Sequence, residues 1–248
     1  LQQRRRELGF DYVATGHYAR RAYDEETGRY LLLRGRDPKK DQSYVLYHLT
    51  QEHLKHMLFP VGELEKPQVR AVAHEAGLGN ADKLESQDIC FVPDGDYATF
   101  IEEHTGATFV PGPIVDETGA VLGKHNGLVH YTIGQRKGLG VAAGHPLFVL
   151  KKDAKTNTLV VGPATSAGVH EVVANDVNLI SVAEIAEPLT VEAKVNYRAT
   201  PRKAVVRMMG DKLIVTFEEP VRAVAPGQAM VLYQGDVVVG GGTIESTR

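Results

Sequence analysis

The stretch Phe10-Asp11-Tyr12-Val13-Ala14-Thr15-Gly16-His17-Tyr18 decides the fold class of the first part of the chain. Its first six residues predict a buried β-strand, and Gly16 then opens a loop. The residues before it predict the last turns of a helix that ends at Gly9, because glycine readily takes the left-handed conformation found at helix ends. A helix, a strand and a glycine-containing loop in this order indicate a parallel α/β sheet, whose sites lie beyond the carboxyl ends of the strands.

The next elements agree with an α/β domain. Residues 18–34 predict a β-hairpin with its turn at 24–28. Four helices are predicted over residues 42–49, over 51–58 with Thr50 as the N-cap, over 67–76 with Gly77 as the stop, and over 97–104.

The composition of the sequence changes at Pro111: from there on, Gly, Pro, Val and Thr are frequent and helical periodicity disappears. Turn signals at 116–119, 153–157 and 209–211 separate short β-branched runs, which indicates small β domains, the last of them a closed barrel. We therefore predict the carboxyl-terminal part of an α/β catalytic domain over residues 1–105, a small central β-rich domain over 106–165 and a C-terminal β-barrel over 166–248.

Composition restricts the cellular setting. The 248 residues are 43% hydrophobic, carry a net charge of −3 and include one cysteine. No apolar run approaches the ~18 residues needed to span a bilayer, no signal peptide is recognisable, and a single cysteine fits a reducing compartment. We expect a cytoplasmic protein without a membrane partner. Because the sequence starts at Leu1 inside an expected helix, we also expect it to be part of a longer protein.

Cys90 stands in the segment Ser86-Gln87-Asp88-Ile89-Cys90-Phe91-Val92. A single thiol cannot form an internal disulfide or a cysteine-rich metal site, so it is either a buried packing residue or a reactive group. Polar residues precede the thiol and apolar residues surround it, a setting that suits a nucleophile whose pKa is lowered. Cys90 is therefore the candidate catalytic residue. His53 and His56 have no further ligands nearby in the sequence, and we predict no metal site.

Three loops are candidates for binding phosphate or RNA. The first is Gly16-His17 after the predicted strand, where an ordinary structural glycine and histidine are the alternative. The second includes Lys40-Asp41-Gln42 beside several cations, and its alternative is a solvated loop with Asp41 as a helix cap. The third presents Arg136-Lys137 between glycines. Residues 122–152 contain five Lys or Arg and no Asp or Glu, a local field that favours a polyanion.

These motifs occur in the same order in a known family. The segments 14–18, 40–44, 86–91 and 130–140 together resemble the bacterial tRNA-specific 2-thiouridylases. The resemblance extends over essentially the whole chain and includes Asn196-Tyr197-Arg198 and Ala225-Pro226-Gly227-Gln228. It implies an adenine nucleotide alpha-hydrolase-like catalytic domain, of which this chain holds a remnant.

The resemblance also implies a chemistry and a set of site residues. Such enzymes use ATP to adenylate the C2 carbonyl of the wobble uridine, and a cysteine persulfide then delivers sulfur and displaces AMP. It implies that Cys90 is the persulfide carrier, loaded by a sulfur-donor protein, and that Gly16 lies near ATP. The tRNA contacts that it implies are His17, Lys40, Asp41, Gln42, Arg198, Ala199 and Gln228, to which the charge argument adds Arg136 and Lys137.

Two features of the family are absent from this sequence. There is no pyrophosphate-binding loop of the Ser-Gly-Gly-x-Asp-Ser type, which would hold most of the Mg-dependent ATP, and no second catalytic cysteine. We therefore expect this polypeptide alone neither to adenylate uridine nor to complete the sulfur transfer. Two alternatives stay open: a related pyrophosphate-loop enzyme that modifies another RNA position, and a non-catalytic RNA-binding module in which Cys90 only packs.

Overall fold

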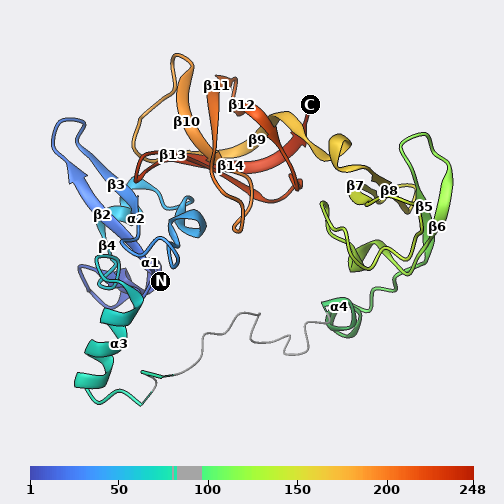
Figure 1. Cartoon of the computed structure of the whole chain (residues 1–248). Helices are drawn as coiled ribbons and strands as arrows, with labels where there is room; N and C mark the ends of the chain where they lie inside the picture. The colour runs from blue at the N-terminus through green and yellow to red at the C-terminus, as the bar shows by residue number, and fades with distance from the viewer. Residues whose placement is uncertain (80, 83–96) are drawn as a thin grey trace. The chain divides into compact units, whose positions relative to one another are not determined.

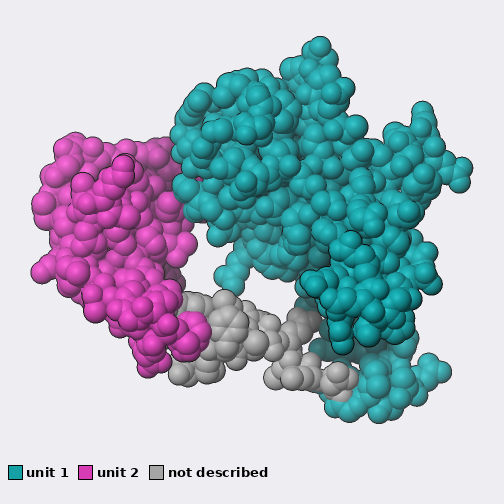
Figure 2. Space-filling model, turned by 180° about the vertical axis from the view of Figure 1, so that it is seen from behind, with its two compact units in different colours: residues 1–83, 170–219, 225–248 teal, residues 84–169, 220–224 magenta. Residues whose placement is uncertain are grey.

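A computed structural model describes residues 1–79, 81–82 and 97–248 of the protein (Figure 1). The chain divides into two compact units, shown in different colours in Figure 2. Unit 1 comprises residues 1–83, 170–219 and 225–248, and unit 2 comprises residues 84–169 and 220–224.

The N-terminal part of unit 1 contains a short parallel sheet and three helices. They are α1 (Gln2–Glu7), β1 (Val13–Ala14), α2 (Gln51–Lys55), β4 (Met57–Leu58) and α3 (Lys66–Glu75). Strands β1 and β4 pair in parallel, with Val13 opposite Met57, which confirms the predicted parallel arrangement. The predicted helix stops are also confirmed, because Gly9 and Gly77 follow α1 and α3 with φ angles of +71° and +67°.

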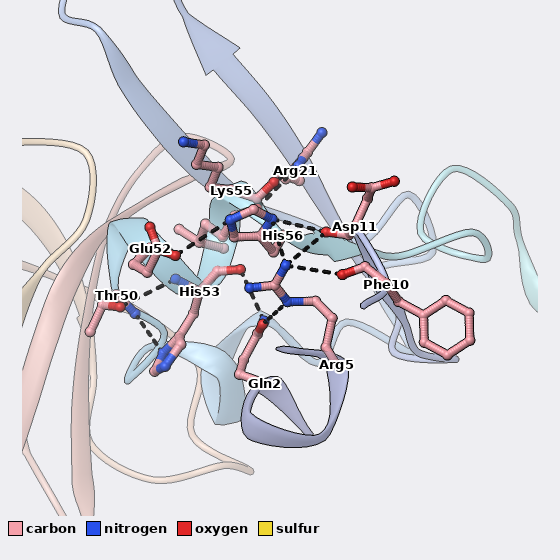
Figure 3. A network of polar contacts seen from close by, with 11 residues as sticks. Gln2, Arg5, Phe10, Asp11, Arg21, Thr50, Glu52, His53, Lys55 and His56 are labelled. Atoms are coloured by element: carbon pink, nitrogen blue, oxygen red, sulfur yellow. Dashed lines mark hydrogen bonds and ion pairs between the residues drawn. The ribbon is translucent and has the colours of Figure 1, made fainter. Parts of the chain in front are cut away.

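Helix α1 is tied to the chain that enters β1 by Arg5 (Figure 3). The Arg5 Nη1 donates to the carbonyl oxygens of Phe10 and Asp11, each at 3.2 Å, and its Nε donates to Gln2 at 2.9 Å. His56 lies against the same carbonyl of Asp11 at 2.9 Å. One guanidinium therefore fixes the direction in which the helix leads into the sheet.

Three expectations for this region were wrong in detail. The strand predicted over 10–15 is shorter and less buried, since Phe10 and Tyr12 are 61% and 51% exposed and β1 has one neighbouring strand among the described residues. The helix predicted over 42–49 is a 3₁₀ turn, η1 (Ser43–Leu46). The helix predicted over 51–58 begins at its Thr50 cap as expected but ends at Lys55. The carbonyls of His56 and Leu58 instead accept hydrogen bonds from Val13 of β1 and from Thr15, which follows β1.

The rest of unit 1 is one large antiparallel sheet. The hairpin β2 (Ala19–Asp24) and β3 (Arg29–Arg34) forms as predicted. Six further strands are β9 (Val169–Leu179), β10 (Leu189–Lys194), β11 (Arg202–Met209), β12 (Lys212–Val221), β13 (Ala229–Gln234) and β14 (Val237–Thr247). They follow the order β13-β10-β11-β12-β9-β14, and β13 also pairs with β14, which confirms the closed barrel.

The hairpin and the barrel share one hydrophobic core. Leu32 of the hairpin and Leu54 of α2 lie in the same buried cluster as Ile180 and Val231 of the barrel part. Polar contacts reinforce this packing: Arg29 Nε donates to the Ile180 carbonyl at 2.8 Å, and Asn178 Nδ2 donates to the carbonyl oxygens of Tyr47 and Leu49. Residues between Val13 and Phe59 thus share one core with the C-terminal barrel.

Unit 2 contains a four-stranded sheet. Its elements are α4 (Tyr97–Thr105), β5 (Gly112–Val115), β6 (Val121–His125), η2 (Leu128–His130), β7 (Phe148–Asp153), β8 (Thr158–Gly162) and η3 (Ala164–Ala167). The strand order is β6-β5-β8-β7, with β5 and β8 parallel. Ile114, Val149 and Leu159 are fully buried in its core. The turns predicted at 116–119 and 153–157 connect β5 to β6 and β7 to β8.

Within the described ranges, no helix is both long and apolar enough to cross a membrane. The same residues contain no group of three or more His, Cys, Asp or Glu placed to hold a metal ion.

Candidate nucleic-acid interface

Asp41 organises the loop that follows β3. Its Oδ1 accepts hydrogen bonds from the backbone N–H groups of Gly35 and Ser43, both at 3.0 Å, and its Oδ2 accepts from the Ser43 hydroxyl at 3.0 Å. A carboxylate that accepts from the N–H two residues later stabilises a turn of this kind. The N-cap residue of the η1 turn is Gln42, so the alternative that Asp41 is a helix cap was wrong. Asp41 instead ties Gly35 to Ser43 and thereby holds the loop that carries Lys40 and Gln42.

Gln42 connects this loop to the segment that contains His17. Its Oε1 accepts from the Tyr18 backbone N–H at 3.0 Å, and its own N–H donates to the Tyr18 carbonyl at 2.9 Å. The His17 ring lies 3.0 Å from the Thr15 hydroxyl. Two of the predicted RNA-contacting segments, far apart in the sequence, are thus held side by side.

Tyr44 brings the C-terminal segments to the same place. Its hydroxyl donates to the carbonyl of Ala229, the neighbour of Gln228, at 2.7 Å. Its ring lies edge-on to Tyr197, with 6.0 Å between the centroids. The Lys194 ammonium lies 5.3 Å from the Tyr44 ring and 5.4 Å from the Tyr197 ring. The loop after β3, the turn after β10 and the start of β13 therefore meet around Tyr44.

The turn after β10 presents Arg198 and Ala199. The Arg198 N–H donates to the side-chain oxygen of Asn196 at 3.0 Å, and the Ala199 N–H donates to the Asn196 carbonyl at 3.2 Å. The Arg198 side chain is exposed, as is that of Gln228, whose backbone bonds to Ala225 and Ile244. Backbone hydrogen bonds fix both segments and leave these two side chains at the surface.

Charged groups beneath this surface pack against tyrosine rings. The guanidinium carbon of Arg34 lies 4.2 Å from the centroid of the Tyr233 ring. The Nη2 of the same side chain forms an ion pair with Glu192 at 3.4 Å. Burial lowers the pKa of Lys194, an effect that Asp41 opposes and Arg34 adds to. Burial also raises the pKa of Tyr233 to about 12, so this hydroxyl stays neutral near pH 7. The site is a mixed cluster of cations, carboxylates and neutral tyrosines.

Sequence reasoning missed part of this cluster. It selected His17, Lys40, Asp41, Gln42, Arg198, Ala199 and Gln228, all of which lie in unit 1, but assigned no role to Tyr44, Lys194 or Tyr197. The available signal was an aromatic residue inside each of two quoted segments, Ser43-Tyr44 and Asn196-Tyr197. Aromatic side chains within cationic segments are typical of surfaces that bind single-stranded nucleic acid.

Arg136 and Lys137 lie in unit 2, on a loop held against β7. The Gly134 N–H donates to the Val149 carbonyl at 2.8 Å, and the Val149 N–H donates to the Gln135 carbonyl at 2.9 Å. The Gln135 side chain accepts from Thr132 and donates to the Lys137 carbonyl. Both cations are exposed. The loop is thus a fixed turn with two cations at its tip.

Gly16 is exposed two residues after the end of β1, and a Cβ added to it would meet nothing within 4 Å. Gly16 thus follows the carboxyl end of a parallel strand, the position at which α/β sheets bind ligands. Cys90 lies outside the described residues.

Comparison with known proteins covers nearly the whole chain. Three family models match: a tRNA methyl transferase HUP domain over residues 1–94, a tRNA methyl transferase PRC-barrel domain over 98–163, and an aminomethyltransferase beta-barrel domain over 169–244.

Individual relatives are about half identical to this chain. The tRNA-specific 2-thiouridylase MnmA of Acetivibrio thermocellus is 51% identical over 239 residues, which cover 96% of this chain and 67% of the relative. The proteins of the same name from Clostridioides difficile and Moorella thermoacetica are 48% and 51% identical over 98% and 99% of this chain, and over 67% and 69% of their own lengths. The chain therefore spans about two thirds of these relatives.

Proposed function

The chain belongs to the family of tRNA-specific 2-thiouridylases, and from this membership we propose that it takes part in the thiolation of a tRNA wobble uridine, with Cys90 as the sulfur carrier. The observation that carries the RNA part of the proposal is the meeting of three distant segments around Tyr44. Each of these segments contributes residues that we assign to tRNA contact, and each is fixed by hydrogen bonds.

The chemistry assigns separate tasks to the groups involved. A carbonyl oxygen is a poor leaving group, and bound ATP supplies its activation by adenylation. The terminal sulfur of a Cys90 persulfide can then bond to C2 as the C2–O bond breaks and the oxygen leaves with AMP. Sulfur suits this step because it is a strong nucleophile even at modest basicity. Release of the product requires a second thiol to cleave the remaining S–S bond.

We assign to this chain the carrier thiol and a tRNA-binding surface. Cys90 is the only cysteine of the 248 residues, and the sequence contains no pyrophosphate loop of the family type. We therefore propose that these 248 residues alone do not complete the reaction. Of the residues present, Gly16 is assigned to the approach of ATP, because it follows the carboxyl end of a parallel strand.

Nucleoside mass spectrometry of bulk tRNA tests the function. Cells that lack their own thiouridylase would receive either this chain or the complete reading frame that contains it. We expect 2-thiouridine with the complete reading frame and none with the 248 residues alone. A new methylated nucleoside, as the name of two of the matching models suggests, or a thiolated base at another position would contradict the proposal. No change in either case would favour a non-catalytic RNA-binding module.

The Arg136 and Lys137 loop provides a separate prediction. Substituting both by Ala should weaken tRNA binding and reduce the slope of log K against log salt by up to about two, because each phosphate contact releases about one counterion. Binding measured at several salt concentrations gives the slope. Arg4→Ala with Arg6→Ala is a control of equal charge, since both side chains are exposed on α1. An unchanged slope in the loop variant would remove this loop from the interface.

A further inference from the structure

Tyr197 is a large aromatic side chain at the surface of the candidate interface. It lies in the turn between β10 and β11 and is 49% exposed. Arg198 follows it directly, and its side chain is exposed as well. About half of the Tyr197 side chain is therefore open to a ligand, while the rest contacts the protein.

The ring is nevertheless held in place from below. The Lys194 ammonium lies 5.4 Å from its centroid, within the range of a cation–π contact, and the same ammonium lies 5.3 Å from the Tyr44 ring. Tyr44 meets Tyr197 edge-on and is anchored by its own hydrogen bond to Ala229. The neighbouring turn is closed by Asn196. A ring fixed in this way loses little further freedom when it binds a flat ligand.

A half-exposed aromatic ring beside an exposed arginine side chain is suited to binding an unpaired nucleobase. Bases present a π-face that stacks on aromatic rings, while the adjacent phosphates meet cations. RNA recognition commonly uses bases of single-stranded loops, because bases in a helix are already stacked on each other. Two other tyrosines are exposed to a similar extent: Tyr12, which has Arg21 as a neighbour, and Tyr23, which packs on Tyr30.

We propose that Tyr197 is a stacking platform for an unpaired base of the tRNA, and that Lys194 is a positioning residue that holds its ring. The inference rests on the proposed function, because it requires an RNA ligand at this surface. Lys194 acts from beneath the ring, whereas Arg198 contacts phosphate. The two roles can be told apart by the salt dependence of RNA binding, because a phosphate contact releases counterions and base stacking does not.

The experiment measures binding of the 248-residue chain to a stem–loop RNA with an unpaired loop and to a fully paired duplex of equal length. Loop positions carry 2-aminopurine one at a time, because the fluorescence of this base is quenched when it stacks on an aromatic ring. The variants are Tyr197→Phe, Tyr197→Leu, Tyr197→Ala, Lys194→Met and Arg198→Ala. Thermal unfolding of each variant shows whether it is folded, and the Leu variant retains apolar packing if the Ala variant does not fold.

We expect Tyr197→Phe to bind like the unsubstituted chain. Tyr197→Leu and Tyr197→Ala should lose about 5- to 150-fold in affinity for the stem–loop, the range found when a base-stacking aromatic residue is removed, with an unchanged salt slope and loss of quenching. Lys194→Met should reduce the quenching without changing the slope. Arg198→Ala should keep the quenching and lower the slope by about one.

Two results would overturn the inference while leaving tRNA binding intact: unchanged affinity of folded Tyr197→Leu, or quenching that persists in that variant. A salt slope that falls in Lys194→Met would place this lysine on phosphate and remove its positioning role. If the unsubstituted chain binds neither RNA, the proposed function fails and the inference falls with it.

Discussion

Cys90→Ser is expected to abolish the formation of 2-thiouridine and to leave the affinity for tRNA nearly unchanged. A serine hydroxyl cannot carry a sulfur atom as a persulfide, so the transferable sulfur is lost while the side-chain volume is almost preserved. The substitution is made in the complete reading frame and expressed in cells that lack their own thiouridylase. Nucleoside mass spectrometry of their tRNA measures the product, and a binding assay with purified protein measures the affinity.

A second measurement separates a carrier thiol from a packing residue. Because Cys90 is the only cysteine of the chain, any sulfur transferred to it from a persulfide donor must appear as one added sulfur atom on the peptide that contains residue 90. The thiol should also react with an alkylating reagent in the folded protein. Resistance to alkylation until the protein unfolds, together with a collapse of tRNA affinity in Cys90→Ser, would show that Cys90 is a structural residue.

Local sequence signals predicted much of the fold. Gly9 and Gly77 mark the ends of α1 and α3, the turn at 24–28 closes the β2–β3 hairpin, and Thr50 caps α2. Each of these features depends on residues within a few positions of one another. The errors have a different origin. The helix expected to reach Leu58 ends at Lys55, because Met57 and Leu58 form a strand that pairs with β1, more than 40 positions earlier in the sequence.

The candidate site shows the same division. Motifs in the sequence located the loops that carry Asp41 and Arg198, but they could not show that one residue joins those loops. Tyr44 reaches an acceptor 185 positions away, and Lys194 lies between two tyrosines that are far apart in the sequence. Long-range contacts of this kind depend on how the hairpin packs on the barrel, which no local pattern encodes. The core that residues between Val13 and Phe59 share with the barrel was not predicted for the same reason.

Gly62→Ala is expected to cause the largest loss of stability among single methyl additions in unit 1. A Cβ at this position would lie 1.7 Å from the carbonyl oxygen of Ala19 and 2.7 Å from its carbonyl carbon. These are backbone atoms of β2, so no side chain can rotate away and the loop must separate from the strand. Overpacking of this kind costs about 1–3 kcal/mol and in rigid settings more.

The strain at Gly62 should also reach the candidate interface. The Gly62 carbonyl accepts a hydrogen bond from the Arg36 N–H at 2.8 Å. Gly35, which precedes Arg36 in the chain, donates its N–H to Asp41. Displacing Gly62 therefore loosens the loop that presents Lys40, so tRNA affinity should fall along with the free energy of unfolding, measured by urea denaturation. Gly79→Ala is the matched control, because a Cβ there meets nothing within 4 Å. It should be neutral or slightly stabilising, since alanine restricts the unfolded chain. Equal stability of the two variants would mean that the loop at Gly62 does not pack on β2 as closely as described.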